Sequence, residues 1–187
     1  MTRLRIAALA ALLLISAPAI AHEGVIHTGC PTGQSFTAGG ITVIGAFVRA
    51  TPKAAQSAGA YFSISNAGPD ADTLTGASSE AASDIALHLM KMNGSVMEMS
   101  AVPDGLPIPA GGTASLDPMG YHLMMTGMGQ QFVEGQCVEM TLHFAKAGDL
   151  PIELNVGSFA QSAPPASSGV SVMSSGAMDM SSMSMPM

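Results

Sequence analysis

The chain has 187 residues, 48% of them hydrophobic, and thirteen acidic against six basic residues give it a formal net charge of −7 at pH 7. This length suits one domain with its own core plus a tail. The acidic balance excludes nucleic-acid binding, whose affinity comes from neutralising phosphates, and leaves no basic cluster to hold the chain on an anionic membrane.

Residues 1–21 have the features of a cleavable signal peptide. Arg3 and Arg5 precede an apolar run at 6–15, and a small-residue cleavage site lies at 19–21. The run has ten residues, fewer than the roughly 20 that span a bilayer, although an uncleaved anchor helix is the alternative. Because no cysteine follows the cleavage site directly, a lipid anchor is not expected. We expect a periplasmic protein without stable membrane insertion.

Residues 22–40 are interpreted as a loop segment. After cleavage, His22 would offer its α-amine and imidazole to Cu(II), with His27 nearby; a frayed terminus is the alternative. Cys30 and Cys137 are the two cysteines of the chain. In an exported protein they predict one disulfide, and a free thiolate ligand is the other possibility.

Short β-type runs separated by turn residues follow, with no long amphipathic helical pattern. They predict an all-β, antiparallel Greek-key sandwich or barrel in a domain spanning 41–159. Residues 77–84 are the one stretch that suggests a helical turn. The expected strands are 41–49, 58–66, 72–77, 85–92, 96–101, 113–116, 121–126, 136–144 and 152–156.

Methionine is unusually frequent, with sixteen in the chain. One cluster follows His88, a second surrounds His122, and a third lies in the C-terminal tail. A thioether is a soft, neutral ligand that suits Cu(I) and not Zn²⁺, Mg²⁺ or Ca²⁺. Since both histidines occur in a His-x-Met triplet, the pattern indicates copper.

The dipeptide Asn93-Gly94 is the preferred loop of a two-residue type I′ hairpin. Centred there, the hairpin would pair Met90 with Met97 and His88 with Met99, all on one face. Opposed side chains have Cβ atoms about 4.5–5.5 Å apart, so one ion could bridge His88 and Met99. Met90 and Met97 could be ligands or a hydrophobic rim.

A second strand repeats the pattern with His122 and Met124 on one side. Packed beside the hairpin, it would complete a set of two imidazoles and two thioethers, with His88 and Met99 as the other pair. Such a set would hold Cu(I) without a hard oxygen ligand. The alternative is that the clustered methionines only fill a core.

Cys137, Met140 and His143 superficially resemble a blue-copper ligand set. Strand alternation places Met140 on the opposite face from the other two, so an electron-transfer cupredoxin fits poorly. Met140 is expected in the core and His143 on the surface.

Residues 160–187 contain mainly serine, glycine, proline and methionine, with one charge. This composition predicts a disordered tail. Its thioethers could bind Cu(I) or a second copper, or they could be solvated and neutral. The candidates are Met178, Met180, Met183, Met185 and Met187.

Over residues 40–156 the chain resembles the periplasmic copper chaperones called PCu(A)C. The resemblance rests on His88, ten residues, Met99, a long connection and His122-x-Met124; the connection is one residue longer than is usual. It implies a cupredoxin-like fold, a non-enzymatic and monomeric Cu(I) carrier, and the ligands His88, Met99, His122 and Met124. The implied partner is a copper acceptor such as a cytochrome c oxidase subunit (Cu_A) or another copper chaperone. A copper-tolerance buffer and a copper oxidase using His22 are alternatives.

Overall fold

The computed structural model describes residues 26–31 and 33–164. None of these residues is helical, so this part of the chain holds no helix that could cross a membrane. Twelve strands account for the fold. They are β1 (Ile26–Thr28), β2 (Ser35–Ala38), β3 (Ile41–Arg49), β4 (Ser57–Asn66), β5 (Asp72–Ser78), β6 (Ala82–Asn93), β7 (Val96–Ala101), β8 (Leu106–Ile108), β9 (Thr113–Leu116), β10 (Tyr121–Met128), β11 (Gln136–Phe144) and β12 (Gly148–Gly157).

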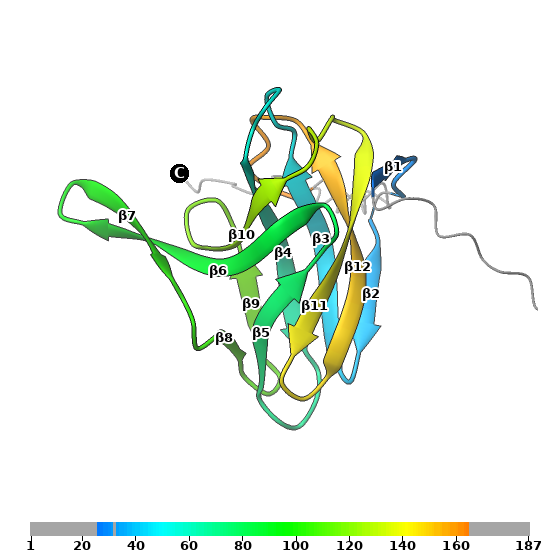
Figure 1. Ribbon diagram of the computed structural model, residues 1–187. Helices are drawn as coiled ribbons and strands as arrows, with labels where there is room; N and C mark the ends of the chain where they lie inside the picture. Colours follow the sequence, from blue (N-terminus) through cyan, green and yellow to red (C-terminus); the bar gives the residue numbers. More distant parts are fainter. Residues whose placement is uncertain (1–25, 32, 165–187) are drawn as a thin grey trace, which may run out of the picture.

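The strands form one mixed sheet in the order β7-β6-β10-β9-β4-β3-β12-β11-β5-β8, with β1 added to β11 and β2 to β3. Most neighbours are antiparallel, as predicted, but β12 runs parallel to β3 and β10 runs parallel to β9. The sheet bends into two layers, with β5 and β11 in front of β3 and β4 (Figure 1). The predicted all-β class is confirmed.

The core lies between these layers and follows the strand alternation. On β11, Val138, Met140, Leu142 and Phe144 occupy alternate positions and are all buried. Residues of this kind from both layers form one continuous hydrophobic cluster. Met140 is therefore a core residue, as predicted.

All nine predicted strands occur, and four have the predicted bounds: β3, β7, β9 and β11. The interpretation of 22–40 as a loop was wrong for β1 and β2, and β8 was also missed. These strands have three or four residues, too few to show a periodic pattern. The suggested helical turn at 77–84 is wrong, because β5 continues to Ser78 and β6 begins at Ala82.

A disulfide joins Cys30, just after β1, to the buried Cys137 of β11, as predicted. The two cysteines are 107 residues apart in the sequence. Because the bond closes a long loop in the unfolded chain, we expect Cys30→Ala/Cys137→Ala to lower the free energy of unfolding by about 2–5 kcal/mol. Urea unfolding of the oxidised protein and the variant measures this difference. Equal free energies of unfolding would show that the disulfide does not stabilise the folded protein.

The β6–β7 hairpin extends from the body as an arm, on the opposite side of the molecule from β1 (Figure 1). Strand β6 has twelve residues. Its first part pairs with β10 inside the body, and its last part pairs only with β7. The candidate ligands lie where these two parts meet.

Candidate metal centre

The predicted register of the arm was wrong by two residues. Strand pairing places Met90 opposite Met99 and His88 opposite Ala101. His88 and Met99 are therefore diagonal neighbours instead of a directly opposed pair. Because a slip of two residues preserves the face on which each side chain lies, both still share one face of the hairpin.

The turn of the arm explains the shift. Its two central residues are Gly94 and Ser95, since Asn93 still pairs with Val96. Gly94 has a φ of 63°, as expected for the first central residue of a type II′ turn. Asn93 stays in the strand, where its Nδ2 donates a hydrogen bond to Glu98 Oε1 at 3.0 Å. The Asn-Gly rule placed Asn93 in the turn and could not anticipate this cross-strand bond.

The two histidines of the His-x-Met triplets lie directly opposite each other. Strand β10 pairs with β6 so that His122 faces His88. Their ring centroids are 5.8 Å apart, with ring planes at 80°. The structure thus brings together two imidazoles that are 34 residues apart in the numbering. This pair is the centre of the candidate site.

Each imidazole has one nitrogen in a state suited to a metal. His122 Nδ1 lies 3.2 Å from the carbonyl oxygen of Gly120 and donates a hydrogen bond to it, which leaves the lone pair of Nε2 free. His88 Nδ1 is buried and has no hydrogen-bond partner. Within residues 26–31 and 33–164 it is the one buried side-chain nitrogen or oxygen in this condition. A coordinated ion would satisfy it, so the donor set fits a metal.

The environment of His122 keeps its ring neutral. Burial lowers the pKa of His122, the neighbouring His88 lowers it further, and the Gly120 carbonyl and Asp117 act in the opposite direction. A neutral imidazole is the form that binds a metal. Copper therefore competes little with protons at neutral pH.

This pKa shift predicts a pH effect on the metal-free protein. The unfolded chain takes up a proton near pH 6.5, while folded His122 takes it up only at lower pH. The unfolded state thus binds more protons in that interval, and the free energy of unfolding falls as pH drops below about 6.5. We expect His122→Gln to flatten the decline between pH 7 and pH 5, measured by urea unfolding at each pH. Identical pH profiles of the free energy of unfolding in the two proteins would contradict a lowered pKa of His122 in the folded state.

The methionine candidates lie on the same face as the two imidazoles. Met124 is two residues beyond His122 and faces Ala86 of β6, so its half-buried side chain shares a face with His122 and is a diagonal neighbour of His88. Met99 is 50% exposed and lies diagonally from His88, within reach of a long side chain. Met90 and Met97 are half-buried further along the arm.

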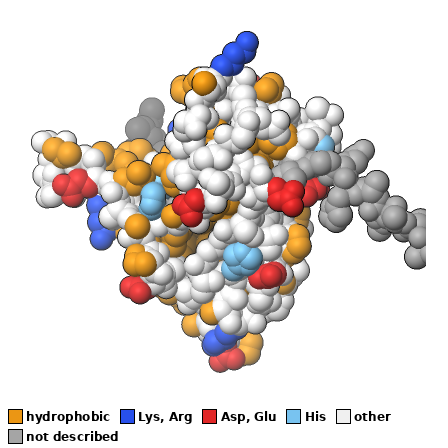
Figure 2. Space-filling model, viewed as in Figure 1, with side chains coloured by type: hydrophobic (Ala, Val, Ile, Leu, Met, Phe, Trp, Pro, Cys, Tyr) orange, Lys and Arg blue, Asp and Glu red, His pale blue; other side chains and the backbone are white. Residues whose placement is uncertain are grey.

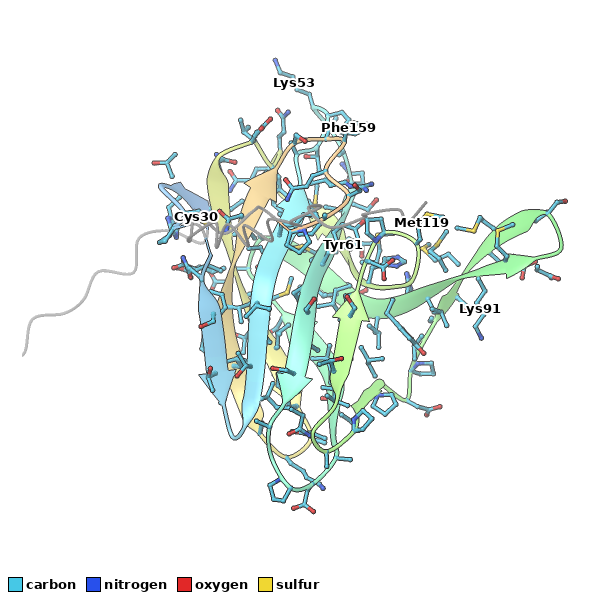
Figure 3. All side chains as sticks on the ribbon, turned by 180° about the vertical axis from the view of Figure 1, so that it is seen from behind. Cys30, Lys53, Tyr61, Lys91, Met119 and Phe159 are labelled. Atoms are coloured by element: carbon cyan, nitrogen blue, oxygen red, sulfur yellow. A yellow bond between two sulfur atoms is a disulfide. The ribbon has the colours of Figure 1, made fainter. Side chains whose placement is uncertain are left out.

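Tyr61 of β4 forms a wall of the site that sequence reasoning missed. Its ring centroid is 6.4 Å from that of His122, and the Arg49 guanidinium lies over the Tyr61 ring, 5.6 Å from its centroid. A side chain at Gly59 would collide with the Tyr61 ring. A glycine inside a strand signals such a close approach, and Gly59-x-Tyr61 was the available signal. Figure 3 shows Tyr61 and Met119 on the side that faces the arm.

Among the remaining candidates that the structure describes, His27 lies away from this site. His22 and the five tail methionines lie outside the described residues. His27 of β1 pairs with Cys137 of β11. Cys30, which follows β1, lies on the far side of the molecule from the arm (Figure 3). The side chains of His27, Cys137 and Glu153 approach within 4.8 Å of one another, but the disulfide occupies the sulfur.

The blue-copper alternative also lacks its ligands. Cys137 is in the disulfide and Met140 is in the core. The half-exposed ring of His143 is held by Asp149 Oδ1 at 2.7 Å and by Ser78 Oγ at 3.0 Å. These three residues do not converge on one point.

A known protein family matches the domain that carries this site. The family model described as "Putative lipoprotein LpqE-like" matches residues 41–156. A relative named "Putative lipoprotein Lxx21020", from Leifsonia xyli subsp. xyli, is 31% identical over 122 residues, covering 65% of this chain and 72% of that protein.

Solved structures show a similar fold. The copper-bound PCuAC domain from PmoF2 is 23% identical with a TM-score of 0.57, covering 67% of this chain and 98% of that domain. The solution structure of CuI-DR1885 from Deinococcus radiodurans is 28% identical with a TM-score of 0.51, covering 66% of this chain and 80% of that one.

The chain forms a cupredoxin-like β-domain that is similar to PCuAC domains, with an opposed histidine pair at the root of a projecting hairpin. The chain belongs to the LpqE-like family.

Proposed function

We propose that this protein is an exported, non-enzymatic Cu(I) carrier that holds the ion through His88, His122, Met124 and Met99. The observation that carries the proposal is the opposed imidazole pair, in which His88 Nδ1 is buried without a partner and His122 Nε2 is left free by the bond of Nδ1 to Gly120. The name of the solved CuI-DR1885 structure gives the same ion for a related fold.

The proposed mechanism is ligand exchange. The two imidazoles and Met124 are set in paired strands, whereas Met99 is on the arm and half-exposed. An acceptor ligand can approach from the arm side and replace Met99 while the histidines still hold the ion. A site with no thiolate binds Cu(I) less permanently than a cysteine site, which suits a carrier.

We propose export by the 1–21 signal peptide to the periplasm, in line with the lipoprotein name of the relative, and delivery toward the Cu_A centre of cytochrome c oxidase. The opposed histidines support copper binding, and the acceptor follows from the PCu(A)C resemblance alone.

A transfer experiment tests delivery against storage. The Cu(I)-loaded mature protein is mixed with an apo Cu_A-domain fragment in the presence of a Cu(I) chelator that removes any released ion. Delivery predicts that the fragment gains copper at a rate that rises with its concentration and is insensitive to the chelator. A rate that does not depend on the fragment concentration would identify a buffer that releases copper into solution.

A further inference from the structure

The outer part of the arm carries four methionines on one face. The register that corrects the sequence prediction places Met90 directly opposite Met99, and Met92 directly opposite Met97. The two pairs are separated by the Lys91–Glu98 pair, whose side chains are on the other face, so four thioethers cover a short stretch of one surface. On the other face, Lys91 faces Glu98, which also accepts the bond from Asn93.

These four side chains do not belong to the core. Met92 is 62% exposed and Met99 is 50% exposed, and none of the four is in the hydrophobic cluster that contains Met125, Met128 and Met140. The arm extends from the body with hydrophobic side chains along it (Figure 2). Exposing this much apolar surface on a hairpin contributes nothing to folding, so packing does not account for the choice of methionine.

The chemistry of this face selects a soft ion. Directly opposed residues have Cβ atoms about 4.5–5.5 Å apart and diagonal neighbours about 7–8 Å, and methionine has three rotatable bonds. The thioethers can therefore converge on one ion. The acidic side chain of the arm, Glu98, is on the opposite face, so hard cations find no carboxylate among the thioethers.

We infer that Met90, Met92 and Met97 form a second Cu(I) site on the outer half of the arm, with Met99 at the boundary and available to either ion. The inference rests on the proposed function for the identity of the ion. The outer site has no imidazole, so it fills after the inner site. Because it lies between the inner site and the tip of the arm, it is the position from which an acceptor would take copper first.

Stoichiometry in four full-length mature proteins tests this inference. They are the parent, Met92→Leu/Met97→Leu, His88→Ala/His122→Ala, and the control Met119→Leu, whose methionine is 69% exposed in a neighbouring turn. Leucine conserves volume and removes the thioether. Each protein is titrated anaerobically with Cu(I) against a weak chelator. Because the tail is the same in all four, a difference in the number of bound copper ions comes from the substituted residues.

We expect the parent to bind one equivalent more than Met92→Leu/Met97→Leu and the same number as Met119→Leu. The copper that remains on the arm of His88→Ala/His122→Ala should show a sulfur-only shell by X-ray absorption. A Met92→Leu/Met97→Leu protein that binds as many equivalents as the parent would overturn the outer site and leave the inner one standing. A His88→Ala/His122→Ala protein that loses no equivalent would instead contradict the proposed function.

Discussion

Replacing His88 and His122 together by alanine is expected to weaken binding of the first Cu(I) equivalent by more than about 100-fold. Loss of an outer-shell partner alone costs about 10–100-fold in metal affinity, and this variant removes both nitrogen ligands. The thioethers that remain are Met124 and those of the arm. Anaerobic competition with a chromogenic Cu(I) chelator measures the affinity.

The matched control is His143→Ala. His143 is a half-exposed histidine bonded to Asp149 and Ser78, on a strand that does not pair with β6 or β10. Its replacement should leave the first equivalent unchanged. Equal affinity in His88→Ala/His122→Ala and in His143→Ala would exclude the proposed inner site.

Substitutions at two adjacent residues of β10 are expected to affect different properties. Leu123 should determine stability, and Met124 should determine copper affinity. Leu123 is fully buried in the core between two ligands that face the other side of the strand. Leu123→Ala should lower the free energy of unfolding by about 2–5 kcal/mol. Met124→Leu conserves volume and should cost less than about 1.5 kcal/mol, while removing a thioether from the copper site.

Urea unfolding of the metal-free proteins, together with Cu(I) competition, separates the two effects. Leu123→Ala should keep its copper affinity wherever it is folded, and Met124→Leu should lose affinity at nearly full stability. If Met124→Leu destabilised the metal-free protein as much as Leu123→Ala, Met124 would be a packing residue and not a ligand.

The sequence was sufficient to predict the face on which each candidate side chain lies, because strand alternation is robust. Each His-x-Met triplet sends imidazole and thioether to one face whatever the neighbouring strand does. Alternation does not determine that β6 pairs with β10, and the structure shows this pairing. The grouping of His88, His122 and Met124 was therefore a conditional hypothesis, which the PCu(A)C resemblance also implied. Leu123 lies on the core face between the last two.

Register was harder to predict because it depends on contacts that the local sequence does not determine. The turn is centred on Gly94 and Ser95, with Asn93 in the strand and bonded to Glu98. The expected His88–Met99 pair is therefore replaced by a Met90–Met99 pair. The role of Tyr61 depends on the pairing of β4 with β10, which joins segments about sixty residues apart. The register of the arm has no signature within a single strand, and for Tyr61 the strand offers only the glycine at position 59.

The most direct test of the inner site is copper K-edge X-ray absorption on the mature protein loaded anaerobically with one equivalent of Cu(I). We expect a mixed shell of imidazole nitrogen and thioether sulfur around the copper, with the outer-shell scattering typical of two histidines. The same spectrum on His88→Ala/His122→Ala should lose the imidazole signal. A sulfur-only shell for the first equivalent in the parent protein would contradict copper binding by His88 and His122.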